Sequence, residues 1–184
     1  MISVPANITV SNDPGQCGAI VNFPASTSTG SCGVLTTSPA SGSFFPVGTT
    51  TVTTTSTSGA SNSFTVTVND TAPPTVSALT VDTSVLWPPN HQLIPITVDY
   101  SSADNCGAVT CVLSATSNEP DNGLGDGDTA NDIQIVDAHH LLLRAERSGK
   151  GDGRIYTIKV TCTDAAGNSV VSAPVTVVVP HSRK

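Results

Sequence analysis

The sequence predicts an all-β protein built as two tandem β-sandwiches. No segment has the period of an amphipathic helix, whereas short alternating segments rich in Val, Ile and Thr recur between clusters of Gly, Pro, Asn and Asp. The charges divide the chain, because residues 1–74 contain two acidic and no basic residues, while all seven Lys and Arg residues follow from Arg144 onward. Pro73 and Pro74 stiffen the junction, since proline cannot donate a ladder hydrogen bond. We therefore expect one domain at residues 1–72 and a second at 73–184.

Five strands are expected in the first half. The segment 63–69 is the clearest, because Phe64, Val66 and Val68 alternate with threonine as in a half-buried strand. The threonine-rich segment 49–57 is interpreted as a strand with a hydroxyl-covered solvent face, and O-glycosylation or a packing face between subunits are the alternatives. The five predicted strands are 7–11, 18–23, 33–38, 49–57 and 63–69.

Seven strands in the second half predict a sandwich there as well. They span residues 75–81, 93–100, 109–116, 132–136, 140–146, 154–163 and 169–179. The connection 148–153 contains three glycines, which supply the positive φ angles of a tight turn. We therefore expect the strands on either side of this connection to pair as a hairpin.

Charge and composition exclude several classes of partner. The formal net charge is −7 and the chain has no clustered basic footprint of the kind that phosphate binding requires. Nucleic acid and anionic membrane surfaces are therefore disfavoured as partners, and we expect no nucleic-acid partner. No apolar run approaches the ~20 residues of a spanning helix, so we expect no membrane insertion. Five cysteines in a small chain favour an oxidising compartment, which predicts a secreted or cell-surface protein.

Four motifs in the first half occur in the order found in a known extracellular repeat. They are PANITV at 5–10, CGAIV at 17–21, FPVGTTTV at 45–52 and FTVTVND at 64–70. With these motifs, residues 2–72 resemble a hyalin repeat (HYR) domain. The resemblance implies an immunoglobulin-like (Ig-like) β-sandwich of the kind found in extracellular, adhesion-associated proteins.

Cysteine usage departs from the HYR pattern. HYR domains often carry one cysteine before the first proline and another before the last phenylalanine, where this chain has Val4 and Ser63. Cys17 and Cys32 then remain as the pair available for a bridge inside the first half, and we expect them to be bonded. Two buried free thiols are the alternative.

The second half resembles a module found near the C-termini of secreted bacterial proteins. The segments that carry this resemblance are LWPPNH, DNCG, NEP, GDGDTA, LRAERSG and TDAAGN, which begin at residues 86, 104, 118, 125, 143 and 163. The resemblance implies an extracellular compartment and an Ig-like sandwich, and it implies no defined reaction.

The three cysteines of the second half permit two different bridges. Cys111 and Cys162 each share a strand face with apolar neighbours two residues away, so both are expected to point to the core. They can then bridge neighbouring or facing strands, which leaves Cys106 unpaired. A local bridge between Cys106 and Cys111 is the alternative.

The segment 118–132 is the most informative cluster of charges, with five acidic residues and three glycines. Ca²⁺ takes about six to eight oxygen ligands, and glycines let a short loop fold around it. We therefore predict a structural Ca²⁺ site that does not follow the EF-hand pattern. The predicted ligands are Asp126, Asp128 and Asp132, followed by Asp121 and Glu119. A solvated acidic turn without metal is the alternative.

Searches for catalytic motifs are negative. The sequence lacks a nucleophile elbow, a phosphate loop, a dinucleotide-binding glycine motif and a zinc-binding HExxH helix, so we predict that the protein is not an enzyme. Trp87 beside His91 is interpreted as a core residue, with a sugar-stacking surface as the alternative. Tyr100 and Tyr156 are the other candidate stacking surfaces for glycans.

Together these features predict a non-enzymatic extracellular structural or adhesion module, stabilised by Ca²⁺, that serves as a spacer or building block of a surface protein or fibre. Its expected partners are other copies or neighbouring Ig-like domains, and exchange of edge strands is a route to a surface filament. The alternative function is a carbohydrate-binding accessory module of a secreted enzyme.

Overall fold

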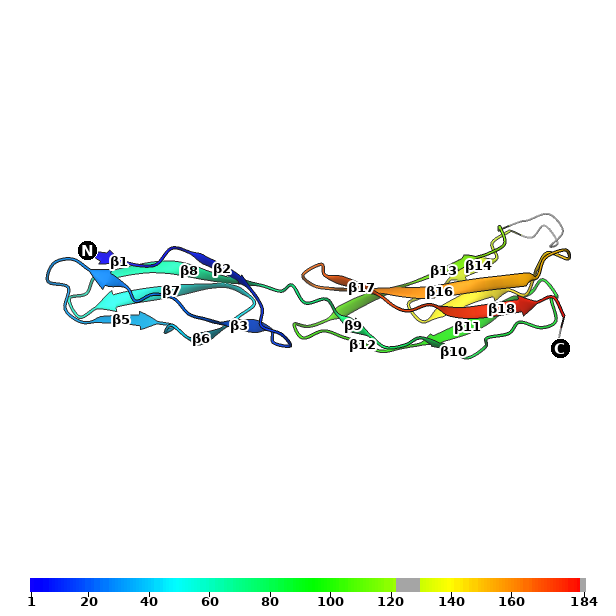
Figure 1. Cartoon of the computed structure of the whole chain (residues 1–184), viewed down its shortest axis with the longest axis horizontal. Helices are drawn as coiled ribbons and strands as arrows, with labels where there is room; N and C mark the ends of the chain where they lie inside the picture. Colours follow the sequence, from blue (N-terminus) through cyan, green and yellow to red (C-terminus); the bar gives the residue numbers. More distant parts are fainter. Residues whose placement is uncertain (122–129, 183–184) are drawn as a thin grey trace. The chain divides into compact units, whose positions relative to one another are not determined.

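A computed structural model describes residues 1–121 and 130–182, and these residues form strands and no helix. Accordingly, this part of the chain contains no helix able to span a membrane. The chain divides into two compact units, Met1–Ala72 and Pro73–Lys184, drawn in blue to green and in green to red in Figure 1. Each unit is a β-sandwich around its own hydrophobic core, which confirms the predicted all-β fold.

The first unit contains eight described strands. They are β1 (Ile2–Ser3), β2 (Ile8–Ser11), β3 (Gly18–Val21), β4 (Thr27–Ser28), β5 (Leu35–Ser38), β6 (Ser43–Pro46), β7 (Gly48–Ser56) and β8 (Ser61–Asn69). A four-stranded sheet has the order β2-β8-β7-β5, and the pairs β3-β6 and β1-β4 complete the unit. Within the large sheet β2 runs parallel to β8, whereas the other neighbours are antiparallel.

The core of the first unit follows the predicted alternation along β8. Phe64, Val66 and Val68 are at most 3% exposed and pack between the strand layers. The intervening residues face outward, where the hydroxyl groups of Thr49 on β7 and Thr67 on β8 are 3.0 Å apart. The threonine-rich strand β7 therefore has a hydroxyl-covered solvent face, as the alternation predicts. Its inward face is only partly apolar, because Thr54 and Ser56 are buried there together with Val52.

The second unit contains the remaining ten described strands. They are β9 (Thr75–Val76), β10 (Thr80–Val81), β11 (Leu93–Asp99), β12 (Ser102–Ala103), β13 (Val109–Ser117), β14 (Ile133–Ile135), β15 (His140–Arg144), β16 (Gly153–Asp164), β17 (Ser169–Val171) and β18 (Val175–Pro180). One sheet has the order β10-β11-β15-β14, and the other has β13 on one side of β16 with β17 and β18 on the other. Fully buried side chains from β11, β15, β16 and β18 meet between these sheets.

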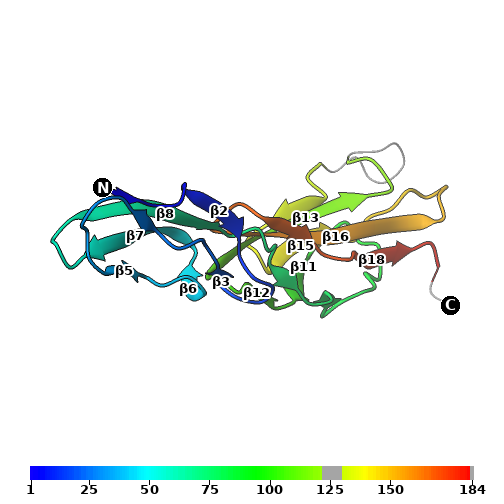
Figure 2. The same ribbon diagram turned by 60° about the vertical axis from the view of Figure 1, so that its left-hand side comes forward.

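The predicted hairpin across residues 148–153 is wrong. Strand β15 pairs with β11 and β14, so both of its edges are occupied within one sheet. Strand β16 pairs with β13, β17 and β18 in the other sheet, and Figure 2 shows it alongside β18. Gly153 has the expected positive φ of 113°. Gly149 and Gly151 do not have positive φ angles, so Gly153 alone adopts the predicted conformation, and glycines do not specify which strands pair.

Candidate functional site

The described acidic residues of the segment 118–132 are held by arginines and backbone amides. Glu119 Oε2 accepts a hydrogen bond from Arg154 Nε at 3.3 Å. Asp132 is bound on both oxygens, because Oδ1 accepts from Arg144 Nε at 3.1 Å and Oδ2 accepts from Arg154 Nη1. Two guanidinium groups therefore neutralise the carboxylates at the base of this segment.

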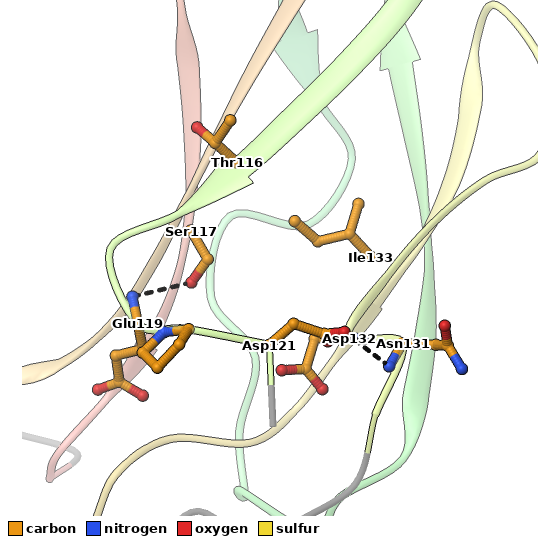
Figure 3. A pocket seen from close by; sticks show the side chains of 8 residues that line it. Thr116, Ser117, Glu119, Asp121, Asn131, Asp132 and Ile133 are labelled. Carbon is orange, nitrogen blue, oxygen red and sulfur yellow. Dashed lines mark hydrogen bonds between the residues drawn. The ribbon is translucent and has the colours of Figure 1, made fainter. Parts of the chain in front are cut away.

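Asp121 is held at the surface by backbone donors. Its Oδ1 accepts the N–H of Asp132 at 2.7 Å and its Oδ2 accepts that of Asn131 at 3.2 Å. These bonds, first that from Asp132, hold the pKa of Asp121 below its ordinary value. Figure 3 shows Asp121 beside Asn131 and Asp132. Around it lies a hollow of about 410 Å³, lined by Thr116, Ser117, Glu119, Pro120, Asp121, Asn131, Asp132 and Ile133.

The three described carboxylates are not arranged as a metal site. Within residues 1–121 and 130–182, Glu119, Asp121 and Asp132 do not each place an oxygen within 4.8 Å of the others. A cation at Asp132 would have to displace two arginines. Asp126 and Asp128, the first predicted ligands, lie outside the described residues. A calcium ion bound by these two residues therefore stays a prediction.

Arg144 and Arg154 are the centre of a buried polar cluster. Arg154 is 0% exposed and also donates to Tyr156 Oη at 3.2 Å. Arg144 is buried as well and also donates to the carbonyl oxygen of His91 at 2.9 Å. Burial lowers the pKa of Arg154, but hydrogen bonds to Asp132 and Tyr156 outweigh it and raise this pKa above its ordinary value. Arg154 is therefore charged inside the sandwich.

Tyr156 is hydrogen-bonded to Arg154 of this cluster and is fully buried. Its hydroxyl donates to the carbonyl oxygen of Arg144 at 2.8 Å, and burial raises its pKa to about 12. The ring has no face open to solvent, so Tyr156 cannot be the glycan-stacking surface that the sequence left open.

A contact between His91 and Glu146 joins the cluster to the segment that follows Trp87. His91 Nδ1 lies 2.8 Å from Oε2 of Glu146, whose side chain is fully buried. The backbone N–H of His91 donates to the carbonyl oxygen of Ala145 at 3.0 Å. Hydrogen bonds of side chains and backbone thus hold residue 91 against residues 144–146.

The cluster unites motifs that are far apart in the sequence. His91 ends LWPPNH, Glu119 is the centre of NEP, and Arg144 and Glu146 belong to LRAERSG. The structure gives these residues a common role in holding loops at one end of the sandwich. Sequence reasoning missed Arg154, although its position two residues before buried Tyr156 on β16 places it on the core face.

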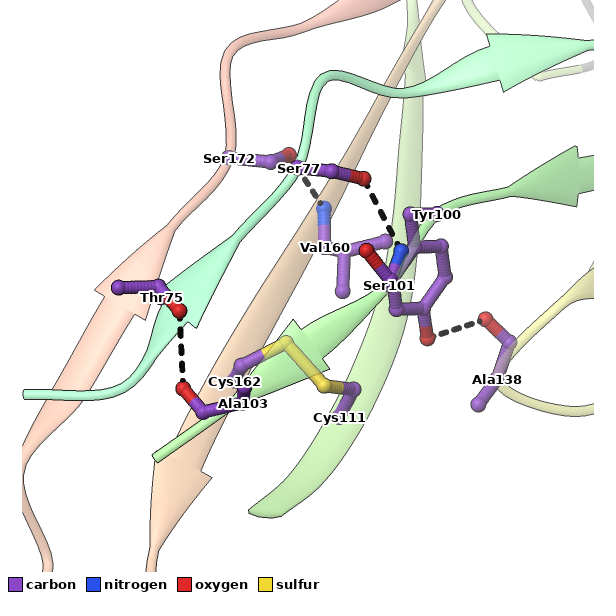
Figure 4. The surroundings of a disulfide bond; sticks show 10 residues. All are labelled: Thr75, Ser77, Tyr100, Ser101, Ala103, Cys111, Ala138, Val160, Cys162 and Ser172. Carbon is purple, nitrogen blue, oxygen red and sulfur yellow. Dashed lines mark hydrogen bonds between the residues drawn. A yellow bond between two sulfur atoms is a disulfide. The ribbon is translucent and has the colours of Figure 1, made fainter. Parts of the chain in front are cut away.

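The second unit contains a disulfide between Cys111 and Cys162. The two residues are register partners on β13 and β16, and their sulfur atoms are 2.09 Å apart. Figure 4 shows this bridge near Tyr100 and Ala103. The alternative bridge from Cys106 to Cys111 is therefore excluded. Cys106, which the sequence left unpaired, is itself disulfide-bonded.

The predicted bond between Cys17 and Cys32 is wrong, because Cys32 is a buried free cysteine and Cys17 is disulfide-bonded without it. The carbonyl oxygen of Cys17 accepts from Val47, just before β7. Val34, close to Cys32, is hydrogen-bonded to Thr57, just after β7. The nine residues of β7 at about 3.3 Å each separate these ends by roughly 30 Å, far beyond the ~6 Å between the Cα atoms of a disulfide.

The aromatic residues are arranged differently from the prediction. Trp87 is 39% exposed, whereas Leu86 is 2% exposed and occupies the core position that we expected for the indole. Tyr100 is half-buried, donates to the carbonyl oxygen of Ala138 at 2.9 Å and stacks on His139 with ring centroids 4.4 Å apart. Trp87 is therefore the most accessible of the three candidate stacking residues.

Comparison with known proteins identifies the first unit. Residues 1–68 match the family model of the HYR domain. The first unit is a HYR domain. Among solved structures, the chain is similar to one titled protocadherin gamma B2 extracellular cadherin domains 3–6, with 13% identity, a TM-score of 0.35 and coverage of 96% of this chain. The chain spans 46% of that structure's length. None of the curated proteins matches the chain.

Proposed function

We propose that the protein is a non-enzymatic extracellular module of tandem Ig-like sandwiches that associates with other copies of itself within a surface structure. The HYR domain and the disulfide of the second unit support an oxidising, extracellular setting. The motifs of the second unit support a structural role, because Glu119 and Arg144 are paired with Arg154 and Asp132 at the buried end of the sandwich.

The proposal rests on the open edge of β13. This strand has nine residues, whereas the other described strands that end a sheet have between two and six. In the described part of the chain, no strand is hydrogen-bonded to the edge of β13 that faces away from β16. Soluble proteins protect such an edge with charge, proline or a bulge, and β13 contains no charged residue and no proline. An unprotected long edge of this kind favours strand pairing with a partner.

A second copy of β13 is the partner that best fits this edge. Antiparallel pairing about a two-fold axis through Leu113, the middle residue, places Val112 opposite Ser114 of the partner and brings no like charges together. The closest charged neighbour is Lys159, which is opposite Ser114 on β16. Two copies of Lys159 would be three strand spacings apart, roughly 14 Å, which exceeds the Debye length of about 8 Å at physiological ionic strength.

The test is sedimentation velocity over a concentration series. We expect the unmodified chain to dimerise, and the double variant Val112→Lys with Ser114→Lys to remain monomeric, because each pairing would set two lysines opposite two others. The matched control is Val171→Lys with Ser169→Lys on β17, where Val171 is 56% exposed against 62% for Val112. A monomeric unmodified chain at millimolar concentration would overturn the proposal. So would equal loss of association in the control.

Calcium binding remains part of the proposed function, with Asp126 and Asp128 in the centre of the acidic segment as the proposed ligands. Asp126 and Asp128 keep the composition of a calcium loop, while arginines occupy Asp132 and Glu119 at its base. A Ca²⁺ ion bound by the loop would stiffen an end of the second unit that the buried cluster already fastens. Its presence is tested below by thermal unfolding.

A further inference from the structure

The segment 83–91 carries the single Trp of the chain on a firmly held backbone. On one side of Trp87, Leu86 is buried and its N–H donates to the carbonyl oxygen of Val178 at 2.8 Å. On the other side, His91 is fastened by Glu146 and by a hydrogen bond from Arg144 Nη1. The buried cluster therefore fixes the position of a partly exposed indole.

A hollow of about 130 Å³ lies beside this indole. It is lined by Thr83, Val85, Leu86, Trp87, Pro88, Asn90, Ile94 and Ala145. These residues include no charged side chain, and they combine an aromatic ring with one hydroxyl and one amide. The oxygen Oδ1 of Asn90 accepts the N–H of Gln92 at 3.2 Å, which orients the amide group. Ligand sites of this composition use apolar walls for affinity and a few fixed polar groups for orientation.

We propose that this hollow, with Trp87 as its platform, binds a single unit of a neutral sugar chain. The C–H face of a sugar ring stacks on an exposed indole, and its hydroxyl groups match the amide of Asn90 and the hydroxyl of Thr83. The volume is well below the ~300 Å³ at which pockets for drug-sized ligands begin, so at most one ring enters the hollow and the rest of the chain stays in solvent. The fixed backbone reduces the entropy that binding would otherwise cost.

Neutral sugars fit this surface better than the other classes of ligand. An anionic glycan would meet no basic residue in the lining. A protein partner needs roughly 800 Å² of surface on each side, whereas the exposed apolar residues here are Trp87 and its neighbour Val85. The proposal adds a binding site to the proposed function and does not depend on pairing through β13.

Fluorescence with selective excitation of tryptophan provides a direct test, because Trp87 is the single tryptophan of the chain. The probes are the hexasaccharides of cellulose, mannan, xylan and starch, with polygalacturonate as the anionic comparison. We expect a saturable change in emission with at least one neutral hexasaccharide and none with polygalacturonate. No change with any of the four neutral probes at millimolar concentration overturns the proposal, and so does a preference for the anionic polymer.

Variants then test whether the ligand binds at the hollow. By calorimetric titration with the active hexasaccharide, we expect Trp87→Ala to weaken binding at least tenfold and Asn90→Ala to weaken it several-fold. The matched control is Val136→Ala, which removes an exposed residue of the same unit that lies outside the hollow. Unfolding midpoints of the variants establish that each is folded. Unchanged binding by Trp87→Ala overturns the site, and the double lysine variant of β13 should bind as the unmodified chain does, which keeps the two proposals separable.

Discussion

Replacing Asp132 by asparagine should weaken the buried cluster and destabilise the second unit. The side chain of Asp132 is 2% exposed and binds both Arg144 and Arg154. The substitution would keep the shape of the side chain but remove the negative charge that two buried guanidinium groups share. Arg144 would retain backbone carbonyl partners, and Arg154 would retain Glu119.

The expected loss follows from the burial of these groups. Removing one partner of a buried ion pair typically costs about 3–5 kcal/mol, because the remaining charge is left desolvated and unpaired. Because Arg144 and Arg154 keep other partners, we expect a loss at the lower end of this range. Asp132→Asn should therefore lower the unfolding free energy by about 3 kcal/mol. That is a large share of the ~5–15 kcal/mol by which a typical domain is stable.

Urea unfolding followed by Trp87 emission measures this loss in the second unit, which contains the single Trp. The control is Asp121→Asn, a surface carboxylate held by backbone amides, for which we expect less than about 1 kcal/mol. The loss from Asp132→Asn should be equal in EDTA and in Ca²⁺, because arginines and not a metal engage this carboxylate. A loss below ~1 kcal/mol, or a loss confined to the calcium buffer, would refute the reasoning.

Three further predictions follow from the second unit. Because folding raises the pKa of Tyr156 from its ordinary 10 to about 12, stability present below pH 10 should fall by about 2.3 kcal/mol as the pH rises to 12, and urea midpoints that do not move over this range would contradict it. Replacing Cys111 and Cys162 by Ser opens a bridge with a sequence separation of 51 and should cost about 4 kcal/mol in thermal unfolding, so an unchanged melting temperature would count against this bond. Millimolar Ca²⁺ should raise the melting temperature over that in EDTA, and Asp126→Ala with Asp128→Ala should abolish the rise; no rise in the unmodified chain leaves a metal-free acidic turn.

Periodicity predicted the all-β fold, whereas the turn glycines of residues 148–153 predicted the wrong strand pairing. The alternation of Phe64, Val66 and Val68 fixed the buried face of β8, because a period of two leaves one face for the core. Strand-face parity also selected the Cys111–Cys162 pair over its local alternative. The bond between the two cysteines of the first unit was predicted by elimination instead, and that prediction failed because it took no account of the length of β7 between them.

The candidate site was less predictable because it depends on partners distant in sequence. The acidic segment was interpreted as a calcium loop from local charge density, and nothing within it indicated that Arg144 and Arg154 would neutralise its base. The position of Trp87 was missed for a similar reason. Leu86 and Trp87 lie between β10 and β11, where no strand period assigns their faces. Composition favoured the larger residue for the core, whereas the sandwich buries Leu86.

Hydrogen exchange of the β13 amides as a function of protein concentration tests the central claim most directly. Alternate amides of an edge strand point away from its single neighbour and exchange readily in a monomer. The account predicts that these amides of β13 become protected as the concentration rises, while those of the three-residue strand β17 do not change. Exchange at β13 that is independent of concentration would contradict association through this strand.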